Sequence, residues 1–234
     1  MHKPTSRVVA ELMGSLPMGG IVVDTPVHAF VEPPPGLVLQ SPSPLVPVRR
    51  DLPMGGQLAF VLDNVVTAEE ADQIVMASEL LGYRPEAPGI ATPPGMRINK
   101  TVHWVAPEAL MEVLFARIGH LLPTELGGKP LHAGFSHRVN IYRYDAQDVF
   151  NRHTDGDWPG YGLNTDGTHM VEWSGLRSGL TMLLYLNAGP QSLDSLRYCP
   201  SYPSATAINH ADAPRRGWGL SGAASPPLPG TRQS

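Results

Sequence analysis

The pattern of apolar and polar positions predicts two short strands joined by a turn within residues 139–155. The turn is Asp145-Ala146-Gln147, and the apolar or β-branched positions around it are Val139, Ile141, Val149 and Phe150. Alternation with a period of two and enrichment in such side chains are typical of strands. A later apolar run, residues 180–186, predicts a buried strand, and a shorter one, residues 58–62, predicts another.

Two other stretches carry the spacing of amphipathic helices. Thr67 and Glu70 match a capping box, in which each side chain bonds a backbone N–H of the first turn. This helix should end at Gly82, and its buried face is predicted at Ala71, Ile74, Val75, Ser78 and Leu81. A second helix should begin at Pro107 and end before Pro123, with Leu110, Leu114, Ile118 and Leu121 on one face.

Proline and glycine set the expected boundaries of the folded part. The chain has 234 residues, with 25 Pro and 24 Gly. Proline is concentrated in residues 1–56, which we therefore expect to be an extended or disordered arm, and again in residues 189–234, which we expect to be an atypical, disordered tail. One domain is predicted between them, at residues 57–188. Within it, residues 156–177 are rich in glycine and are expected to form a long loop.

Charge and cysteine usage exclude some classes of protein. The net charge is −4, and the longest basic runs are pairs, which argues against a nucleic-acid-binding protein. Residues 1–20 lack the apolar run of a secretory signal, and no stretch has the length of a membrane span. The single cysteine, Cys199, excludes an internal disulfide framework and fits a reducing compartment. We therefore expect a cytoplasmic protein without a membrane partner; its oligomeric state is left open.

A candidate metal-binding pair follows the first predicted strands. His153 and Asp155 are two residues apart, so in extended chain both side chains point to the same side. An imidazole and a carboxylate that converge in this way, together with one more histidine, form the facial triad of non-haem Fe(II) sites. A second His-x-Asp, at His210 and Asp212, shows that the motif alone is not specific.

The setting of the pair is more specific than the pair. The run NIYRYDAQDVFNRHTDG followed by LTMLLYLN resembles the prolyl 4-hydroxylase-like branch of the Fe(II)- and 2-oxoglutarate-dependent dioxygenases. The resemblance extends over residues 58–188. It implies an α+β fold with a double-stranded β-helix (jelly roll) core, incomplete at its C-terminal end, and flanking N-terminal helices. It also implies hydroxylation of an aliphatic C–H, such as that of peptidyl proline, coupled to decarboxylation of 2-oxoglutarate to succinate, with ascorbate as an accessory.

The resemblance also implies roles for individual residues. His153 and Asp155 would bind Fe(II), and Tyr144, Tyr185 and Thr181 would contact 2-oxoglutarate. Arg97 would face a substrate, which is a peptide or a small molecule. Apart from the resemblance, Trp158 is expected at the mouth of the predicted loop, either to contact that substrate or to pin the loop to the barrel. For Arg97 a salt bridge or a charge at a strand edge is the alternative. The tyrosines are equally consistent with packing in strands.

The chain departs from this family after residue 188. The glycine-rich turn and the later strands of the family have no counterpart in the sequence, and the basic residue that binds 2-oxoglutarate there is not identified, although Arg215 and Arg216 follow His210. His210 is the candidate for the third ligand, with His169 as a further histidine near the pair. Three alternatives follow: an inactive, truncated oxygenase fold; a hydrolase or lyase that uses the pair with Zn²⁺; and a nucleic-acid demethylase, which the acidic net charge disfavours.

Overall fold

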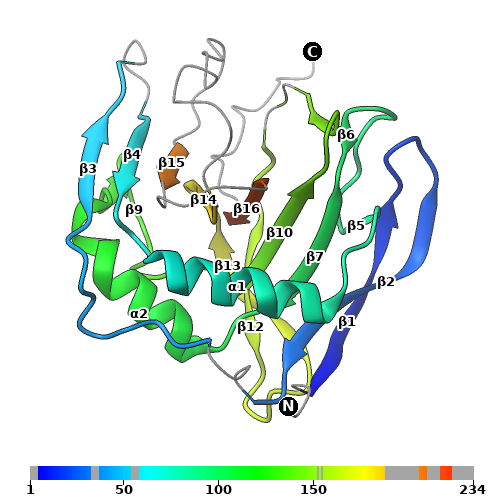
Figure 1. Cartoon of the computed structure of the whole chain (residues 1–234), viewed down its shortest axis with the longest axis horizontal. Coiled ribbons are helices and arrows are strands. Elements are labelled where there is room, and N and C mark those ends of the chain that lie inside the picture. Colours follow the sequence, from blue (N-terminus) through cyan, green and yellow to red (C-terminus); the bar gives the residue numbers. More distant parts are fainter. Residues whose placement is uncertain are drawn as a thin grey trace, which may run out of the picture.

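The computed structural model describes residues 5–32, 37–53, 58–151, 153 and 155–187, and the backbone of two later strands. The fold is α+β, rich in strands, with two α-helices and a curled mixed sheet (Figure 1). The helices are α1 (Ala68–Leu81) and α2 (Glu108–Ile118), with a 3-10 turn at Gly119–Leu121. The strands are β1 (Ser6–Ser15), β2 (Ile21–Phe30), β3 (Val48–Asp51), β4 (Phe60–Asp63), β5 (Ala87–Pro88), β6 (Arg97–Ile98), β7 (Lys100–Val105), β8 (Glu125–Leu126), β9 (Lys129–Pro130), β10 (Arg138–Tyr144), β11 (Val149–Phe150), β12 (Pro159–Leu163), β13 (Met170–Arg177), β14 (Thr181–Tyr185), β15 (Thr206–Asn209) and β16 (Gly217–Gly222).

Ten strands form the main sheet, in the order β3-β4-β15-β14-β16-β10-β7-β2-β1-β5. Most neighbours are antiparallel, but β14 and β15, β15 and β4, and β2 and β7 are parallel pairs. Three two-stranded sheets lie beside it: β11 with β6, β12 with β13, and β8 with β9. The first of them matters for the site, because β11 ends three residues before His153.

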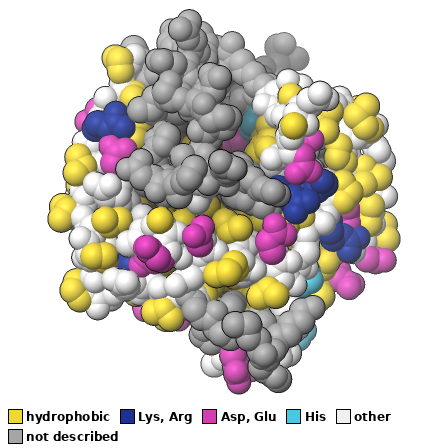
Figure 2. All heavy atoms as spheres, viewed as in Figure 1, with side chains coloured by type: hydrophobic (Ala, Val, Ile, Leu, Met, Phe, Trp, Pro, Cys, Tyr) yellow, Lys and Arg dark blue, Asp and Glu magenta, His cyan; other side chains and the backbone are white. Residues whose placement is uncertain are grey.

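Both helices cover one face of the main sheet (Figure 1). The main core joins them to strands β4, β7, β10 and β14, and its fully buried members include Phe60, Trp104, Ile118, Ile141 and Leu184. Acidic side chains are scattered over the surface above α1 (Figure 2). A smaller cluster, formed by Val9, Val27, Ala29 and Val105, lies beneath the β1–β2 hairpin.

Both predicted helices are present, and the predicted start and stop of the first are confirmed. Thr67 caps α1 and accepts a bond from the Glu70 N–H at 3.2 Å, while the Glu70 carboxylate accepts one from the Thr67 N–H at 2.9 Å. Gly82 ends α1 with φ 85°, a conformation that side chains with a Cβ rarely adopt. The second helix is shorter than predicted, because α2 ends at Ile118 and the chain tightens into a 3-10 turn.

Glu70 also joins the two helices. Its carboxylate accepts two bonds of 2.7 Å from the guanidinium of Arg117 in α2 and one of 2.8 Å from the Gln40 N–H. Both side chains of the pair are at most 4% exposed. Nearly all hydrogen-bonding groups of this buried ion pair have a partner. Removal of one residue would leave the charge of the other buried and unpaired.

The interpretation of residues 1–56 as an extended or disordered arm needs correction, because strands of the main sheet lie within them. Strands β1 and β2 pair over ten residues each, and β2 joins β7 of the main sheet. Pro17 lies in the turn between them, and Pro26 is tolerated within β2 opposite Glu11. The prolines hid a hairpin whose outer face exposes Val8, Met13, Ile21 and Val23. Its core comes from contacts with β7, which local composition does not reveal.

The loop predicted at residues 156–177 is instead a hairpin of β12 and β13. Its turn is closed by bonds between Asn164 and His169. We interpreted its glycines as loop signals, but two of them make room for an aromatic ring. A Cβ at Gly160 or Gly162 would lie 2.5 or 2.9 Å from the indole of Trp173.

The predicted C-terminal tail contains two strands that its sequence did not indicate. The β15 and β16 backbones pair with β14 on either side, and β16 also pairs with β10. The other residues of the tail, 189–205, 210–216 and 223–234, lie outside the described residues. Neither helix in the described part of the chain has the length and apolarity needed to cross a bilayer.

Candidate functional site

His153 and Asp155 converge, as their spacing predicts. The His153 Nε2 atom lies 3.1 Å from Asp155 Oδ1, and both side chains are about one-third exposed. Two ligands at right angles and about 2.1 Å from one metal ion would lie about 3 Å apart. The observed separation therefore fits two adjacent positions of an octahedral metal ion. That the pair binds a metal stays a prediction.

The neighbours of His153 fix which ring nitrogen faces Asp155. Its Nδ1 atom lies 2.8 Å from the carbonyl oxygen of Asn151, so Nδ1 carries the hydrogen and donates it. In the neutral ring, Nε2 then presents a lone pair to a carboxylate, which also offers only lone pairs. Two facing lone pairs need a positive ion between them, either a proton or a metal ion.

The pKa values describe the proton-filled form of the pair. The hydrogen bond with Asp155 raises the pKa of His153 above its usual value, against the opposing effect of burial. The same bond lowers the pKa of Asp155, helped by its contact with Thr181. The pair therefore favours an imidazolium beside a carboxylate when no metal is bound, and a metal must displace that proton.

Three contacts hold the pair in place. The ring of Phe150, at the end of β11, stacks on the His153 ring with centroids 4.0 Å apart and planes 10° apart. Thr181, the first residue of β14, donates its hydroxyl hydrogen to Asp155 Oδ2 at 3.0 Å. Asn151 is bound to the backbone of residues 95 and 96. In metal sites, contacts of this kind hold the ligating side chains in their orientation. Here they leave Asp155 Oδ1 facing His153.

Tyr144 and Tyr185 lie near each other on the sheet. Burial raises the pKa of both phenols, so both stay protonated at neutral pH and can donate hydrogen bonds. Tyr185 is on the strand that also supports the pair, because it belongs to β14, four residues after Thr181, whereas Tyr144 ends β10. Their arrangement permits the predicted role at an oxygen-rich ligand but also fits packing.

Arg97 is enclosed within the protein. Its side chain is 0% exposed; it donates to Asn99 Oδ1 and, at 3.1 Å, to the Pro85 carbonyl oxygen. The described part of the chain offers Arg97 no carboxylate within 4.0 Å, so the salt bridge considered as the alternative is not found there, and the role of Arg97 toward a substrate stays a prediction. Trp158 lies at the start of the β12 hairpin, bonded through its backbone to Ser178, with the Arg138 guanidinium 5.6 Å from its ring.

The third ligand is not identified among the described residues. His210 lies outside them. His169 is in the β12–β13 turn, where its ring contacts the Thr168 hydroxyl. In the described part of the chain, no group of three His, Cys, Asp or Glu side chains could hold a metal ion.

A buried polar cluster on β7 and β10 was missed in the sequence. His103 and Asn140 are directly paired across these strands, and Arg138 lies 3.5 Å from His103 Nδ1. Burial, followed by the nearby Arg138 and Arg97, lowers the pKa of His103 well below its usual value, so its ring is neutral. The alternation Arg138, Asn140, Tyr142 along β10 was the available signal, since it places polar residues on one face.

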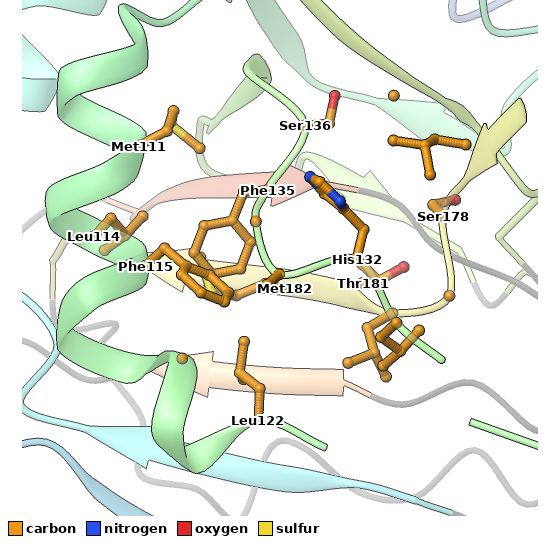
Figure 3. Close-up of a pocket in the computed structure, with 18 of the residues that line it drawn as sticks. Met111, Leu114, Phe115, Leu122, His132, Phe135, Ser136, Ser178, Thr181 and Met182 are labelled. Atoms are coloured by element: carbon orange, nitrogen blue, oxygen red, sulfur yellow. The ribbon is translucent and has the colours of Figure 1, made fainter. Parts of the chain in front are cut away.

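A large cavity was also missed. It has a volume of about 650 Å³ and lies between α2, residues 122–136 and strands β13 and β14 (Figure 3). Thr181 is among its lining residues, so the cavity reaches the residue that holds Asp155. Its walls come from segments far apart in the sequence, which periodicity within one element cannot bring together.

Comparisons with protein-family models, with curated proteins and with solved structures gave no match to this chain. The resemblance noted in the sequence therefore stays a prediction, and the argument for function rests on the geometry of the site.

Proposed function

We propose that this chain is an Fe(II)- and 2-oxoglutarate-dependent dioxygenase of the prolyl 4-hydroxylase-like type, built on a jelly-roll core. The observation that carries the proposal is the 3.1 Å approach of His153 Nε2 to Asp155 Oδ1, with the Nδ1 hydrogen already donated to Asn151. This arrangement offers two lone pairs to one cation from adjacent positions. The sequence around the pair, which resembles this family, supplies the choice of chemistry.

Each residue has a defined part in this proposal. His153 and Asp155 hold the metal, and Phe150 and Thr181 keep their side chains from turning away. Tyr144 and Tyr185 donate hydroxyl hydrogens to the 2-oxoglutarate carboxylates. Bound Fe(II) would supply the activation of O2 that couples decarboxylation of 2-oxoglutarate to hydroxylation of an aliphatic C–H. Ascorbate would maintain the reduced metal, and His210 is the candidate for the third ligand.

Metal binding is the first test. We expect the full chain to bind Fe(II) under anaerobic conditions, measured by calorimetry, and the His153→Ala and Asp155→Ala variants to lose this binding. His120→Ala removes an exposed histidine elsewhere and is the matched control. Equal binding by His153→Ala and the wild type would refute the assignment of the metal to this pair.

Turnover is the second test and separates an active enzyme from an inactive one. The full chain with Fe(II), 2-oxoglutarate, ascorbate and O2 should form succinate in the absence of a known substrate, and His153→Ala should not. Loss of succinate in His210→Ala would assign the third ligand. Fe(II) binding without succinate above the His153→Ala background would instead favour the inactive alternative. A preference for Zn²⁺ without any effect of 2-oxoglutarate would favour a hydrolase or lyase.

A further inference from the structure

The cavity beside Thr181 has the size of a small-molecule site. Its volume of about 650 Å³ falls within the range of pockets that enclose drug-sized ligands. Both helices, residues 122–136 and strands of the main sheet line it, together with the β12–β13 hairpin, so residues of the fold's core form part of its wall. An apolar space left unfilled forfeits dispersion contacts, which a ligand of matching chemistry would restore.

One end of the cavity is apolar. Met111, Leu114 and Phe115 of α2 face Phe135 and Met182 across it (Figure 3). The rings of Phe115 and Phe135 pack edge to face, with centroids 5.4 Å apart, and so form a fixed wall. Leu122 closes this end at the base of the 3-10 turn (Figure 3). The side chains here favour an aliphatic chain.

The other end is polar and carries a positive charge. Figure 3 shows His132, Ser178 and Thr181 on the side away from α2. Of the charged lining residues, Arg177 is paired with Asp157 at 3.1 Å, and Arg138 is buried and donates to the Pro88 carbonyl oxygen at 2.6 Å. Lys129, in β9, lies near this end, because it pairs with Leu126, whose side chain would lie 3.9 Å from a Cβ at Gly179, between Ser178 and Thr181. It has no carboxylate within 4.0 Å in the described part of the chain. The unbalanced lysine favours an anionic head group at this end.

From this segregation we propose that the cavity binds an amphipathic aliphatic carboxylate, with its chain against α2 and its carboxylate against Lys129. The polar end is also the end that touches Asp155 through Thr181. One further step rests on the proposed function. In that case the ligand is the substrate, and the carbons next to its carboxylate lie nearest to His153 and Asp155. The binding itself requires no metal.

Binding of dodecanoate to the metal-free full chain, measured by calorimetry below the micelle concentration, tests the proposal. We expect saturable binding of dodecanoate and no binding of acetate, which lacks the chain. Dodecanol should bind about three-fold more weakly than dodecanoate, because a charge at a solvent-exposed rim contributes little.

Two variants locate the ligand. Leu122→Trp fills the apolar end and should weaken dodecanoate binding by at least about ten-fold. Leu80→Trp makes the same change at an exposed position of α1 outside the cavity and should leave binding unchanged. Lys129→Gln should weaken dodecanoate by about three-fold and leave dodecanol unchanged, with Lys100→Gln as its control. Because Lys129 is exposed, this variant keeps the fold even if Leu122→Trp does not.

The outcomes separate this proposal from the oxygenase proposal. No binding of dodecanoate, or equal binding by the wild type and a folded Leu122→Trp variant, would overturn the cavity assignment. If Lys129→Gln weakened the binding of dodecanol as much as that of dodecanoate, the placement of the carboxylate against Lys129 would be overturned. His153→Ala should bind dodecanoate as the wild type does, so a missing metal site leaves this result intact. Faster succinate formation with dodecanoate in the wild type alone would join the two proposals.

Discussion

The two faces of the main sheet differ in chemistry although they share the same strands. Along β7 and β10, the face beneath the helices carries Val102, Trp104, Val139 and Ile141, all in the main core. The opposite face carries Thr101, His103, Arg138, Asn140 and Tyr142. Since side chains alternate along a strand, one sequence builds both surfaces. The first face holds the fold together, and the second bears the polar groups beside the candidate site.

The two faces also differ in whether a buried charged side chain has a partner of opposite charge. On the helix side, Arg117 is bound by both carboxylate oxygens of Glu70. On the polar side, Arg97 and Arg138 are buried with no carboxylate within 4.0 Å in the described part of the chain. An uncompensated buried cation lowers the stability of the folded protein, so a contribution to stability does not explain why Arg97 and Arg138 are buried. We therefore expect substitutions on the two sides to have very different effects.

The largest effect is expected from Glu70→Ala. It leaves Arg117 buried without its partner, and we expect the free energy of unfolding to fall by about 3–5 kcal/mol. Urea denaturation measures it, with Glu69→Ala, an exposed neighbour in the same helical turn, as the control. Equal stability of the two variants would mean that the pair does not anchor α1 to α2.

The same pair predicts a dependence on pH. Burial of Glu70 raises its pKa, but the bonds from Arg117, Thr67 and Gln40 outweigh this, and the pKa lies below the usual 4.5. A lowered pKa in the folded state stabilises the protein above pH 4.5, and this stabilisation is lost as the pH falls below that value. Glu70→Gln should therefore show a shallower loss of stability in acid, measured by urea denaturation between pH 6 and about pH 3.

The next effect is expected from Ile141→Ala on the helix-covered face. Ile141 is 0% exposed in the main core, and removing its side chain leaves a cavity. We expect a loss of about 3 kcal/mol in the free energy of unfolding. Ile21→Ala, at a position 68% exposed in β2, should change it by less than about 0.5 kcal/mol.

A smaller effect is expected from Arg138→Met on the polar face. The variant loses the 2.6 Å bond to the Pro88 carbonyl oxygen but also removes an uncompensated charge from the interior. We expect the free energy of unfolding to change by less than about 1 kcal/mol in either direction. A loss as large as that of Glu70→Ala would show that the two faces do not differ as we describe.

The smallest effect on stability is expected at the pair itself, where the readout is the His153 pKa. Asp155→Asn removes the hydrogen bond that raises this pKa, so it should fall toward 6.5 in the metal-free protein, as measured by NMR titration. In the wild type the raised value contributes stability below pH 6.5, which is lost as the pH rises through the folded pKa. An unchanged pKa in Asp155→Asn would contradict the pairing.

Local signals in the sequence predicted the parts of this fold that depend on local interactions. The capping box of Thr67 and Glu70 and the helix stop at Gly82 need only neighbours in the chain, and both are confirmed. The convergence of His153 and Asp155 was predicted from their spacing in an extended chain, and the two side chains do meet, at 3.1 Å, although neither residue lies in a strand. The β1–β2 hairpin was missed, because its strands are stabilised by β7, some eighty residues away along the chain.

The polar face could be predicted in part. The alternation of Arg138 and Asn140 was visible in the sequence, but their pairing with His103 depends on the register of β7 against β10. The cavity depends on several separate segments, and no pattern within one of them indicates it. His210, the candidate for a third metal ligand, lies outside the described residues, so this role stays a prediction.

The order of strands in the main sheet also constrains how the protein is made. Strand β4 pairs with β15, so Phe60 must wait for Ala207 to be synthesised, and β10 and β14 must wait for β16. Contacts between such distant residues form slowly, and strand edges stay open until they do. Strand β14 is synthesised before β15 and β16, so we expect both of its edges to stay unpaired until those two strands have been made.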